Sequence, residues 1–180
     1  MLFREIFGLR FDDMPKVWRA FHTVSGNHCY HGKAKVVRGK GLLTGVLAWL
    51  LKLPPTSHVP IELTIEKGNQ GEVWRRQFGA YNFSTLLSPA KGETPLCLYE
   101  TYFPFRFCVA LQVDETSVQW TLYDWWLFGV KLPKALVPIS KTIEYVDNEG
   151  RYAFDIDLHI RFLGPLIAYK GWLDVERNTV

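Results

Sequence analysis

The chain has 180 residues, which fits a single domain, residues 1–180, with a sizeable core. Its formal net charge is only +3 and its 21 Lys and Arg are scattered, so a nucleic-acid partner is not expected. Aromatic residues make up 15% of the chain; such residues favour strands, and they line ligand cavities as well as filling cores.

Cysteine usage and the charges near the N-terminus bear on the cellular compartment. The three cysteines, Cys29, Cys97 and Cys108, form no pairing pattern, which predicts reduced thiols. Charged residues interrupt residues 1–25, so we expect no signal peptide. The longest apolar stretch, residues 42–53, is too short to span a bilayer. These features favour a cytoplasmic protein without a transmembrane segment.

Two helical segments are predicted in the first third of the chain. In residues 1–26, Met14 begins an i, i+3, i+4, i+7 series of apolar side chains that defines one helix face. Residues 42–53 carry a second apolar stripe of helical period, which a Pro-Pro pair ends. Further apolar side chains flank this stripe, so the second helix is expected to be buried or to lie against another apolar surface. The stripe consists of Leu43, Val46, Leu47, Leu50 and Leu51.

From residue 59 onward the period of the apolar residues changes to two, which predicts strands. Ile61, Leu63 and Ile65 alternate with polar residues, and residues 152–160 repeat this alternation. Residues 89–92 are expected to form a turn and residues 129–138 a loop. Further strands are predicted at residues 30–38, 72–78, 81–87, 95–103, 105–113, 118–126, 141–146 and 166–175.

The predicted fold is mainly β within the α+β class, with two N-terminal helices. Roughly eight to ten short strands joined by short turns indicate an antiparallel barrel or a deeply curved sheet. A helical N-terminal segment is expected at residues 1–55 and the antiparallel β body at residues 56–176. A β-sandwich is the alternative fold.

The sequence around Arg76 suggests a ligand site. Trp74, Arg76 and Phe78 share one face of a strand, so the two aromatic residues place Arg76 on the apolar side. A buried guanidinium needs a partner, and Glu100 shares its strand face with apolar residues. Arg76 could hold the polar end of a ligand, form a purely structural pair with Glu100, or lie solvated at a sheet edge. Tyr169 is a further candidate ligand contact.

The histidines and glycines give little support for a bound metal or cofactor. His28 and His31 flank Cys29 at a spacing that resembles half of a metal site, but the chain has no matching second half. His22 ends the first helical segment and is expected to contact the carbonyl groups of that helix end. The chain lacks a Gly-x-Gly-x-x-Gly fingerprint, so we expect neither a metal nor a nicotinamide cofactor.

Several short segments occur in an order that characterises one family. They are Phe11-Asp12-Asp13-Met14-Pro15, Phe21-His22, Gly32-Lys33-Ala34, Arg38-Gly39, Leu53-Pro54, Val59-Pro60, Trp74-Arg75-Arg76, Phe83-Ser84, Leu132-Pro133, Leu136-Val137-Pro138 and residues 163–173. This order resembles the uncharacterised, mainly bacterial family catalogued as domain of unknown function 4166. The resemblance implies no known catalytic residues. Similar domains occur alone or after a dehydrogenase-like domain, so the resemblance also implies a possible dehydrogenase-like partner protein.

Three classes of function remain open from the sequence. The favoured one is a non-enzymatic pocket protein that binds a small hydrophobic or amphipathic ligand inside the barrel. The second is an accessory or interaction domain beside a dehydrogenase-like enzyme, which a large exposed apolar patch around residues 42–53 would support. The third is an enzyme of unknown reaction that uses Arg76, Glu100 and either His22 or Tyr169. The residues expected to line a pocket are Trp74, Phe78, Phe83, Trp120 and Phe154.

Overall fold

The computed structural model of the protein describes residues 1–90 and 96–175. Strands dominate this part of the chain, and the α-helices all precede residue 51. In chain order the elements are α1 (Leu2–Phe7), the 3-10 helix η1 (Gly8–Asp13), α2 (Lys16–His22), β1 (Asn27–Arg38), α3 (Leu42–Leu50), β2 (Ser57–Gly68), β3 (Gly71–Phe78), β4 (Tyr81–Pro89), β5 (Cys97–Tyr102), β6 (Phe105–Val113), β7 (Ser117–Leu127), β8 (Val130–Lys131), the 3-10 helix η2 (Lys134–Leu136), β9 (Ile139–Val146), β10 (Tyr152–Ile160) and β11 (Gly164–Asp174).

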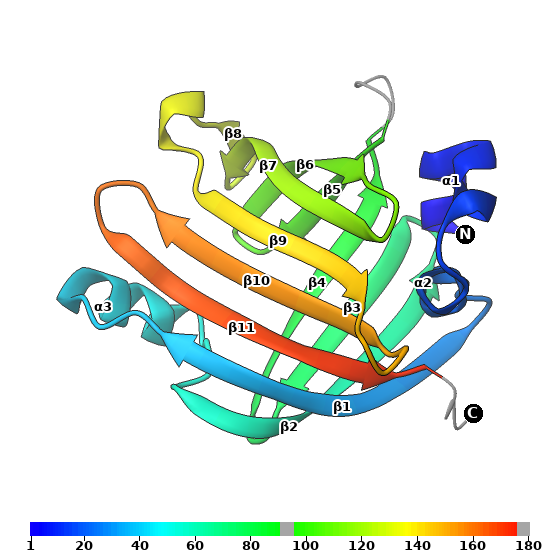
Figure 1. Ribbon diagram of the computed structural model, residues 1–180. Helices are drawn as coiled ribbons and strands as arrows, with labels where there is room; N and C mark the ends of the chain where they lie inside the picture. Colours follow the sequence, from blue (N-terminus) through cyan, green and yellow to red (C-terminus); the bar gives the residue numbers. More distant parts are fainter. Residues whose placement is uncertain (91–95, 176–180) are drawn as a thin grey trace.

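Ten of the eleven strands in the described residues close into an antiparallel barrel (Figure 1). In one direction from β1 the sheet runs through β2, β3, β4, β5 and β6, and in the other through β11, β10, β9 and β7. The pairing of β6 with β7 closes the ring, while the two-residue β8 extends the end of β7. The barrel confirms the predicted fold, and the sandwich alternative is wrong because one continuous sheet surrounds the interior.

The N-terminal helices cover one end of the barrel and α3 lies at the other (Figure 1). Phe3 of α1 and Trp18 and Phe21 of α2 are completely or almost completely buried, and the rings of Phe21 and Tyr152 stack with centroids 3.8 Å apart. Burying aromatic rings of this size provides much of the hydrophobic free energy that holds the helices on the barrel. The apolar face predicted for the first helical segment is therefore buried, and the helices that carry it close one end of the barrel.

The helical segment predicted for residues 1–26 is divided into three short helices, α1, η1 and α2. The helix breaks at Gly8, whose φ of +56° suits glycine, and a new helix begins after Pro15. Residues 27–29, expected outside any strand, already belong to β1. The expected loop at residues 129–138 holds the short elements β8 and η2.

Two other expectations concern the segment around residues 89–95 and the burial of α3. Part of the turn expected at residues 89–92, and the start of the strand expected at residue 95, lie outside the described residues. The burial expected for α3 is wrong for much of the helix. Thr44 and Ala48 are its buried residues, whereas Leu42 and Trp49 are 85% and 72% exposed. None of the helices in the described part of the chain has the length and hydropathy needed to cross a bilayer.

Candidate ligand cavity

The barrel interior contains a cavity of about 360 Å³ with a mostly apolar wall. Apolar residues line it from α3, at one end, to β10 and β11. Residues 152–160 provide five of its wall residues, all at even positions, as the alternation predicts. The ten-stranded barrel is thus wide enough to leave space between its inward side chains. The β10 wall residues are Tyr152, Phe154, Ile156, Leu158 and Ile160.

Arg76 lies on the cavity wall, as the strand alternation predicts. Its Nη1 donates a hydrogen bond to Thr85 Oγ1 at 2.9 Å, and its guanidinium carbon lies 5.2 Å from the ring centroid of Trp74 and 5.6 Å from that of Phe83. Only 12% of the Arg76 side chain is exposed. The two aromatic rings and the hydroxyl therefore fix the direction of the guanidinium within the cavity.

Glu100 is the carboxylate that faces Arg76, as predicted from strand parity. Glu100 Oε1 lies 4.0 Å from Arg76 Nη2, which is too long for a hydrogen bond but within the range of an ion pair. Tyr169 borders the same charges, and burial raises the pKa of its phenol, with the Arg76 charge opposing that rise. Arg76, Glu100 and Tyr169 thus form one polar area on an apolar wall.

A second polar group lies at the end of the cavity that the N-terminal helices close. Glu144 Oε2 accepts a hydrogen bond from Trp18 Nε1 at 3.0 Å and lies 2.9 Å from His22 Nε2. His22 has no exposed surface, and Glu144 is almost as buried. Burial raises the pKa of Tyr152 well above its usual value, with contributions from the charge and hydrogen bond of Glu144. The expected role of His22 at its helix end is therefore wrong: α2 packs onto the barrel, so His22 reaches Glu144 instead.

One polar atom on the wall has no hydrogen-bond partner among the described residues. Trp120 is 6% exposed and lines the cavity, and its Nε1–H is buried without an acceptor. A buried N–H without an acceptor costs about 1–3 kcal/mol.

The structure brings four of the five predicted site residues to the cavity. Trp74, Arg76, Glu100 and Tyr169 line it, whereas Phe78 packs behind the wall against the rings of Phe83 and Tyr169, at 5.8 and 5.2 Å between centroids. Of the other residues expected to line a pocket, Phe83, Trp120 and Phe154 do so.

The sequence analysis missed Glu144, although the sequence contains a signal for it. The turn at residues 147–150 sets the register of the β9–β10 hairpin, and this register places Glu144 opposite the inward residue Phe154. Directly opposite residues point to the same face of a sheet. Buried Glu72 was also missed; it accepts hydrogen bonds from the Leu2 backbone N–H and from Trp74 Nε1, both at 3.3 Å.

His28, Cys29 and His31, the residues considered for a metal site, lie on different faces of β1. His28 lies beside the core residue Tyr30, whereas Cys29 and His31 lie on the outer face with Glu62. His31 Nε2 is 3.7 Å from Cys29 Sγ, but it is the other ring nitrogen, Nδ1, that lies 3.6 Å from Glu62 Oε2. One ligand atom from each of these three residues lies within 4.8 Å of the other two, so the three residues form a small candidate metal site on the outer face, with one ligand fewer than a structural zinc site has.

A family comparison covers most of the chain. The model of the family described as Domain of unknown function (DUF4166) matches residues 14–173. The chain belongs to the DUF4166 family. All residues that line the cavity fall within the matched range, so the cavity is built entirely from the DUF4166 domain. No curated protein matches the chain.

Proposed function

We propose that this DUF4166 domain binds a small amphipathic ligand inside its barrel and does not itself catalyse a reaction. The observation that carries the proposal is the apolar cavity of about 360 Å³ with Arg76 on its wall. Sites for small molecules have volumes of about 300–1,000 Å³, mostly apolar walls and a few placed polar groups. The apolar part of the ligand contacts the β10 wall, and its polar end lies at Arg76.

The donors on the wall define the chemistry of the polar end. A guanidinium has five N–H donors, more than the contacts of Arg76 with Thr85 and Glu100 use. We therefore propose that the ligand carries an acceptor group such as a carboxylate, which a guanidinium binds in a planar, two-pronged geometry.

The arrangement of the acidic and basic groups favours binding over catalysis. His22, the residue best suited to proton transfer, is fully buried behind Glu144, whose Oε2 also accepts the Trp18 N–H. A general base must come within hydrogen-bond reach of its substrate. Arg76 and Glu100 do reach the cavity; the guanidinium stays protonated and cannot exchange a proton, which leaves Glu100 as the titratable member of this pair.

An accessory role beside a dehydrogenase-like enzyme is the second candidate function. The outer face of α3 carries exposed Leu42, Leu43, Val46, Trp49 and Leu50, which is the apolar patch expected of an interaction domain. This face and the cavity are separate features, so the two functions are compatible.

Titration with dansylated undecanoic acid, a fluorescent fatty-acid probe, tests the proposed function. We expect saturable, one-to-one binding with enhanced, blue-shifted dansyl emission. Arg76→Gln should weaken binding of the acid about tenfold, since a charge-assisted hydrogen bond contributes about 1.5–3 kcal/mol, but should leave binding of the methyl ester almost unchanged. Arg75→Gln is the matched control, because the neighbouring Arg75 lies on the outer face and pairs with Glu66 at 3.0 Å.

A cavity-filling variant tests whether the probe lies inside the barrel. Thr142 lines the cavity, so Thr142→Phe should reduce binding of both acid and ester. Thr121→Phe, on the exposed face of β7, is its control. Failure of the wild-type protein to bind either probe, or equal binding by the Thr142 and Thr121 variants, would rule out a ligand site in the barrel.

A further inference from the structure

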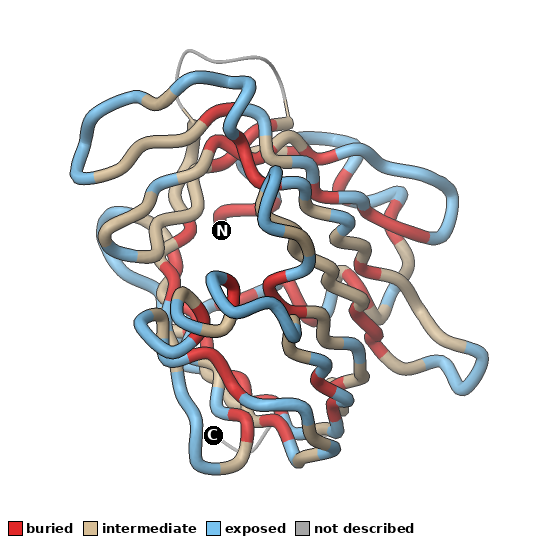
Figure 2. Tube along the Cα trace, turned by 90° about the vertical axis from the view of Figure 1, so that its left-hand side faces the viewer, coloured by how far each residue is buried: buried red, intermediate tan, exposed pale blue. Residues whose placement is uncertain are grey.

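Four segments at the α3 end of the barrel form one continuous ring, which we call the mouth ring: residues 39–56, 102–107, 125–139 and 160–166. Each segment contributes residues to the cavity wall, so the ring surrounds the cavity entrance. Figure 2 shows this end of the barrel, with the exposed stretches in pale blue. Neighbouring segments are joined by hydrogen bonds from the Tyr102 hydroxyl to the Leu51 carbonyl, from Phe128 N–H to the Pro104 carbonyl (3.0 Å), from Arg161 Nε to the Val137 carbonyl (3.3 Å) and from Gly39 N–H to the Leu166 carbonyl (3.0 Å).

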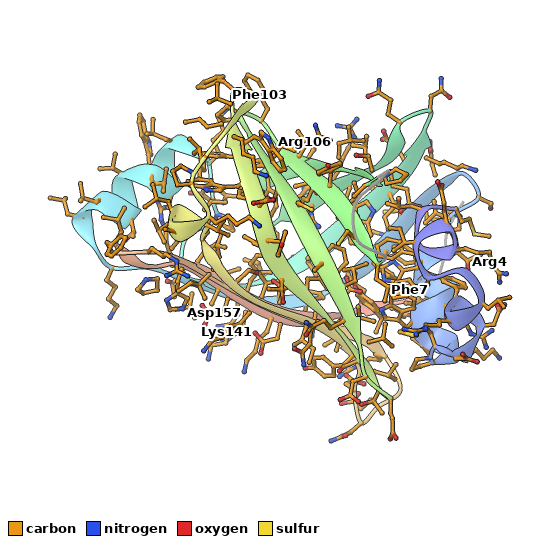
Figure 3. All side chains as sticks on the ribbon, turned by 90° about the horizontal axis from the view of Figure 1, so that it is seen from above. Arg4, Phe7, Phe103, Arg106, Lys141 and Asp157 are labelled. Atoms are coloured by element: carbon orange, nitrogen blue, oxygen red, sulfur yellow. The ribbon has the colours of Figure 1, made fainter. Side chains whose placement is uncertain are left out.

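The mouth ring exposes large apolar side chains on every one of its segments. Most of the strongly exposed large apolar residues of the described chain belong to it. Figure 3 shows Phe103 of this ring far from the N-terminal helices that carry Arg4 and Phe7. The clearest cases are Leu42 (85% exposed), Trp49 (72%), Phe103 (79%), Phe128 (70%), Val130 (65%) and Phe162 (90%).

Two of these aromatic residues occupy backbone positions that normally favour glycine or asparagine. Phe128 has a φ of +48° and Phe162 a φ of +67°. A bulky residue in the left-handed region is uncommon and costs backbone energy. The turns therefore present an exposed phenylalanine where a small or polar residue would be more stable, which points to a binding role for these side chains.

The charges of the mouth ring are all positive. Its four segments contain six basic residues and no Asp or Glu. All six side chains are exposed, and each segment places at least one of them near an exposed apolar residue. Two of the turns at the opposite end are acidic, with Asp114 and Glu115 after β6 and Asp147 and Glu149 after β9. The basic residues are Lys40, Lys52, Arg106, Lys131, Lys134 and Arg161.

Asp124, just outside the mouth ring, reduces this charge only in part. Its Oδ2 lies 2.9 Å from Lys131 Nζ and its Oδ1 lies 3.7 Å from Lys134 Nζ, but Asp124 is buried while more than half of each lysine side chain is exposed. The outward electrostatic potential of the ring is therefore positive.

We propose that the mouth ring docks on the surface of a lipid bilayer that contains anionic lipids, with the cavity entrance facing the acyl chains. Apolar side chains interspersed with Lys and Arg are the composition of surfaces that lie at a membrane interface, where the apolar groups enter the boundary and the basic groups meet anionic headgroups. A protein partner would match less well, because the apolar groups project from four separate segments and the charges between them have one sign. The proposal goes beyond ligand binding, since docking does not require an occupied cavity.

Co-sedimentation with vesicles tests the proposal. Vesicles of phosphatidylcholine mixed with phosphatidylserine should bind the wild-type protein, and vesicles of phosphatidylcholine alone should bind it much less. Added salt should reduce the binding to the mixed vesicles, because ions screen the attraction between exposed charges. Phosphatidylserine supplies the anionic headgroup, so the comparison measures the charge requirement directly.

Matched surface variants test which residues of the mouth ring contribute to vesicle binding. Trp49→Ser with Phe162→Ser should lower partitioning at least about tenfold through the loss of two buried apolar side chains. Leu9→Ser is its control, because Leu9 is 90% exposed at the opposite end of the barrel. Lys40→Gln with Lys52→Gln should remove most of the preference for phosphatidylserine, whereas Arg10→Gln with Lys67→Gln should not.

Several results would overturn docking on a bilayer. The first is a wild-type protein that binds neither kind of vesicle. The second is an equal loss of vesicle binding in the ring variants and in their controls. The third is a mouth ring that instead mediates self-association or binding of a dehydrogenase-like protein. Arg76→Gln should dock normally, and the ring variants should still bind dansylated undecanoic acid. Failure of docking and failure of ligand binding are therefore separate results. Thermal melting of each variant confirms that its fold is intact.

Discussion

His22 and Glu144, which are 122 residues apart in the chain, meet at the closed end of the barrel with 2.9 Å between Nε2 and Oε2. Both side chains are buried, and Trp18 Nε1 donates to the same carboxylate oxygen. This contact joins α2 to β9, two elements that sequence periodicity alone does not bring together. It anchors the N-terminal helices to the floor of the ligand cavity.

Removal of the Glu144 carboxylate should strongly destabilise the protein. Glu144→Ala leaves both His22 and the Trp18 N–H without their acceptor in a buried site, so we expect the free energy of unfolding to fall by about 3–5 kcal/mol. Glu144→Gln should cost less because its amide oxygen still accepts one hydrogen bond. Urea unfolding measures both values. Exposed Glu115 provides the control: Glu115→Ala should change stability by less than about 0.5 kcal/mol, and an equally small effect at Glu144 would contradict this role.

The Arg76–Glu100 contact should contribute modestly to stability. Its distance of 4.0 Å and the 24% exposure of Glu100 make it weaker than a fully buried pair. Arg76→Ala should lower the free energy of unfolding by about 1–3 kcal/mol, because Glu100 loses its compensating charge. In a double-mutant cycle, the Arg76→Ala/Glu100→Ala protein should be more stable than the sum of the single changes predicts. Strict additivity would show that the pair is not coupled.

Stability should fall at alkaline pH because of Tyr152, which is buried, and Tyr169, which is partly buried on the cavity wall. Burial raises the folded-state pKa of Tyr152 and of Tyr169 above the usual value near 10. Below that value both states keep the phenol proton, so stability is unaffected. Above it the unfolded chain loses the proton first, and each tyrosine should lower stability by up to about 1.4 kcal/mol per pH unit. Tyr152→Phe with Tyr169→Phe should flatten this slope in urea unfolding measured on both sides of pH 10; an unchanged slope would refute the assignment.

The three cysteines should differ in reactivity. Each keeps a reduced thiol; Cys97 and Cys108 are buried, while Cys29 is half-buried on the outer face of the barrel. Burial raises the pKa of Cys29, which lowers its thiolate fraction. Ellman's reagent should modify Cys29 slowly in the native protein and all three thiols in denaturant without a reductant. A total below three in denaturant would indicate a disulfide and contradict the structure.

The fold and the position of Arg76 on the cavity wall could be predicted because the alternation of inward and outward side chains along a strand is a local property. The apolar residues of β10 and the shared parity of Trp74 and Arg76 follow from the period of two, and the structure places them in the cavity wall. Glu100 follows from the cost of an isolated buried charge. The inward direction of these side chains is thus independent of which strands are neighbours.

Sequence patterns could not predict features that depend on how elements pack. Helix α3 is apolar around most of its circumference, so its period could not identify the face on the barrel. Small Thr44 and Ala48 are its buried residues and Leu47 packs against the core, whereas most of its other large side chains remain exposed. Glu144 has inward parity with Thr142 on a strand whose outward residues include Ile143, so the usual rule of apolar residues inside fails there, and only the register of the β9–β10 hairpin indicates its position. The contact of His22 was predicted wrongly because its partner, Glu144, lies on a strand that is distant in the sequence.

A crystal structure of the protein grown with dodecanoic acid tests ligand binding inside the barrel most directly. We expect electron density for the acyl chain along the inner face of β10, next to Phe154 and Ile156, with the carboxylate within hydrogen-bond distance of Arg76. A barrel interior filled by protein side chains, or a fatty acid found only on the outer face of α3, would contradict it.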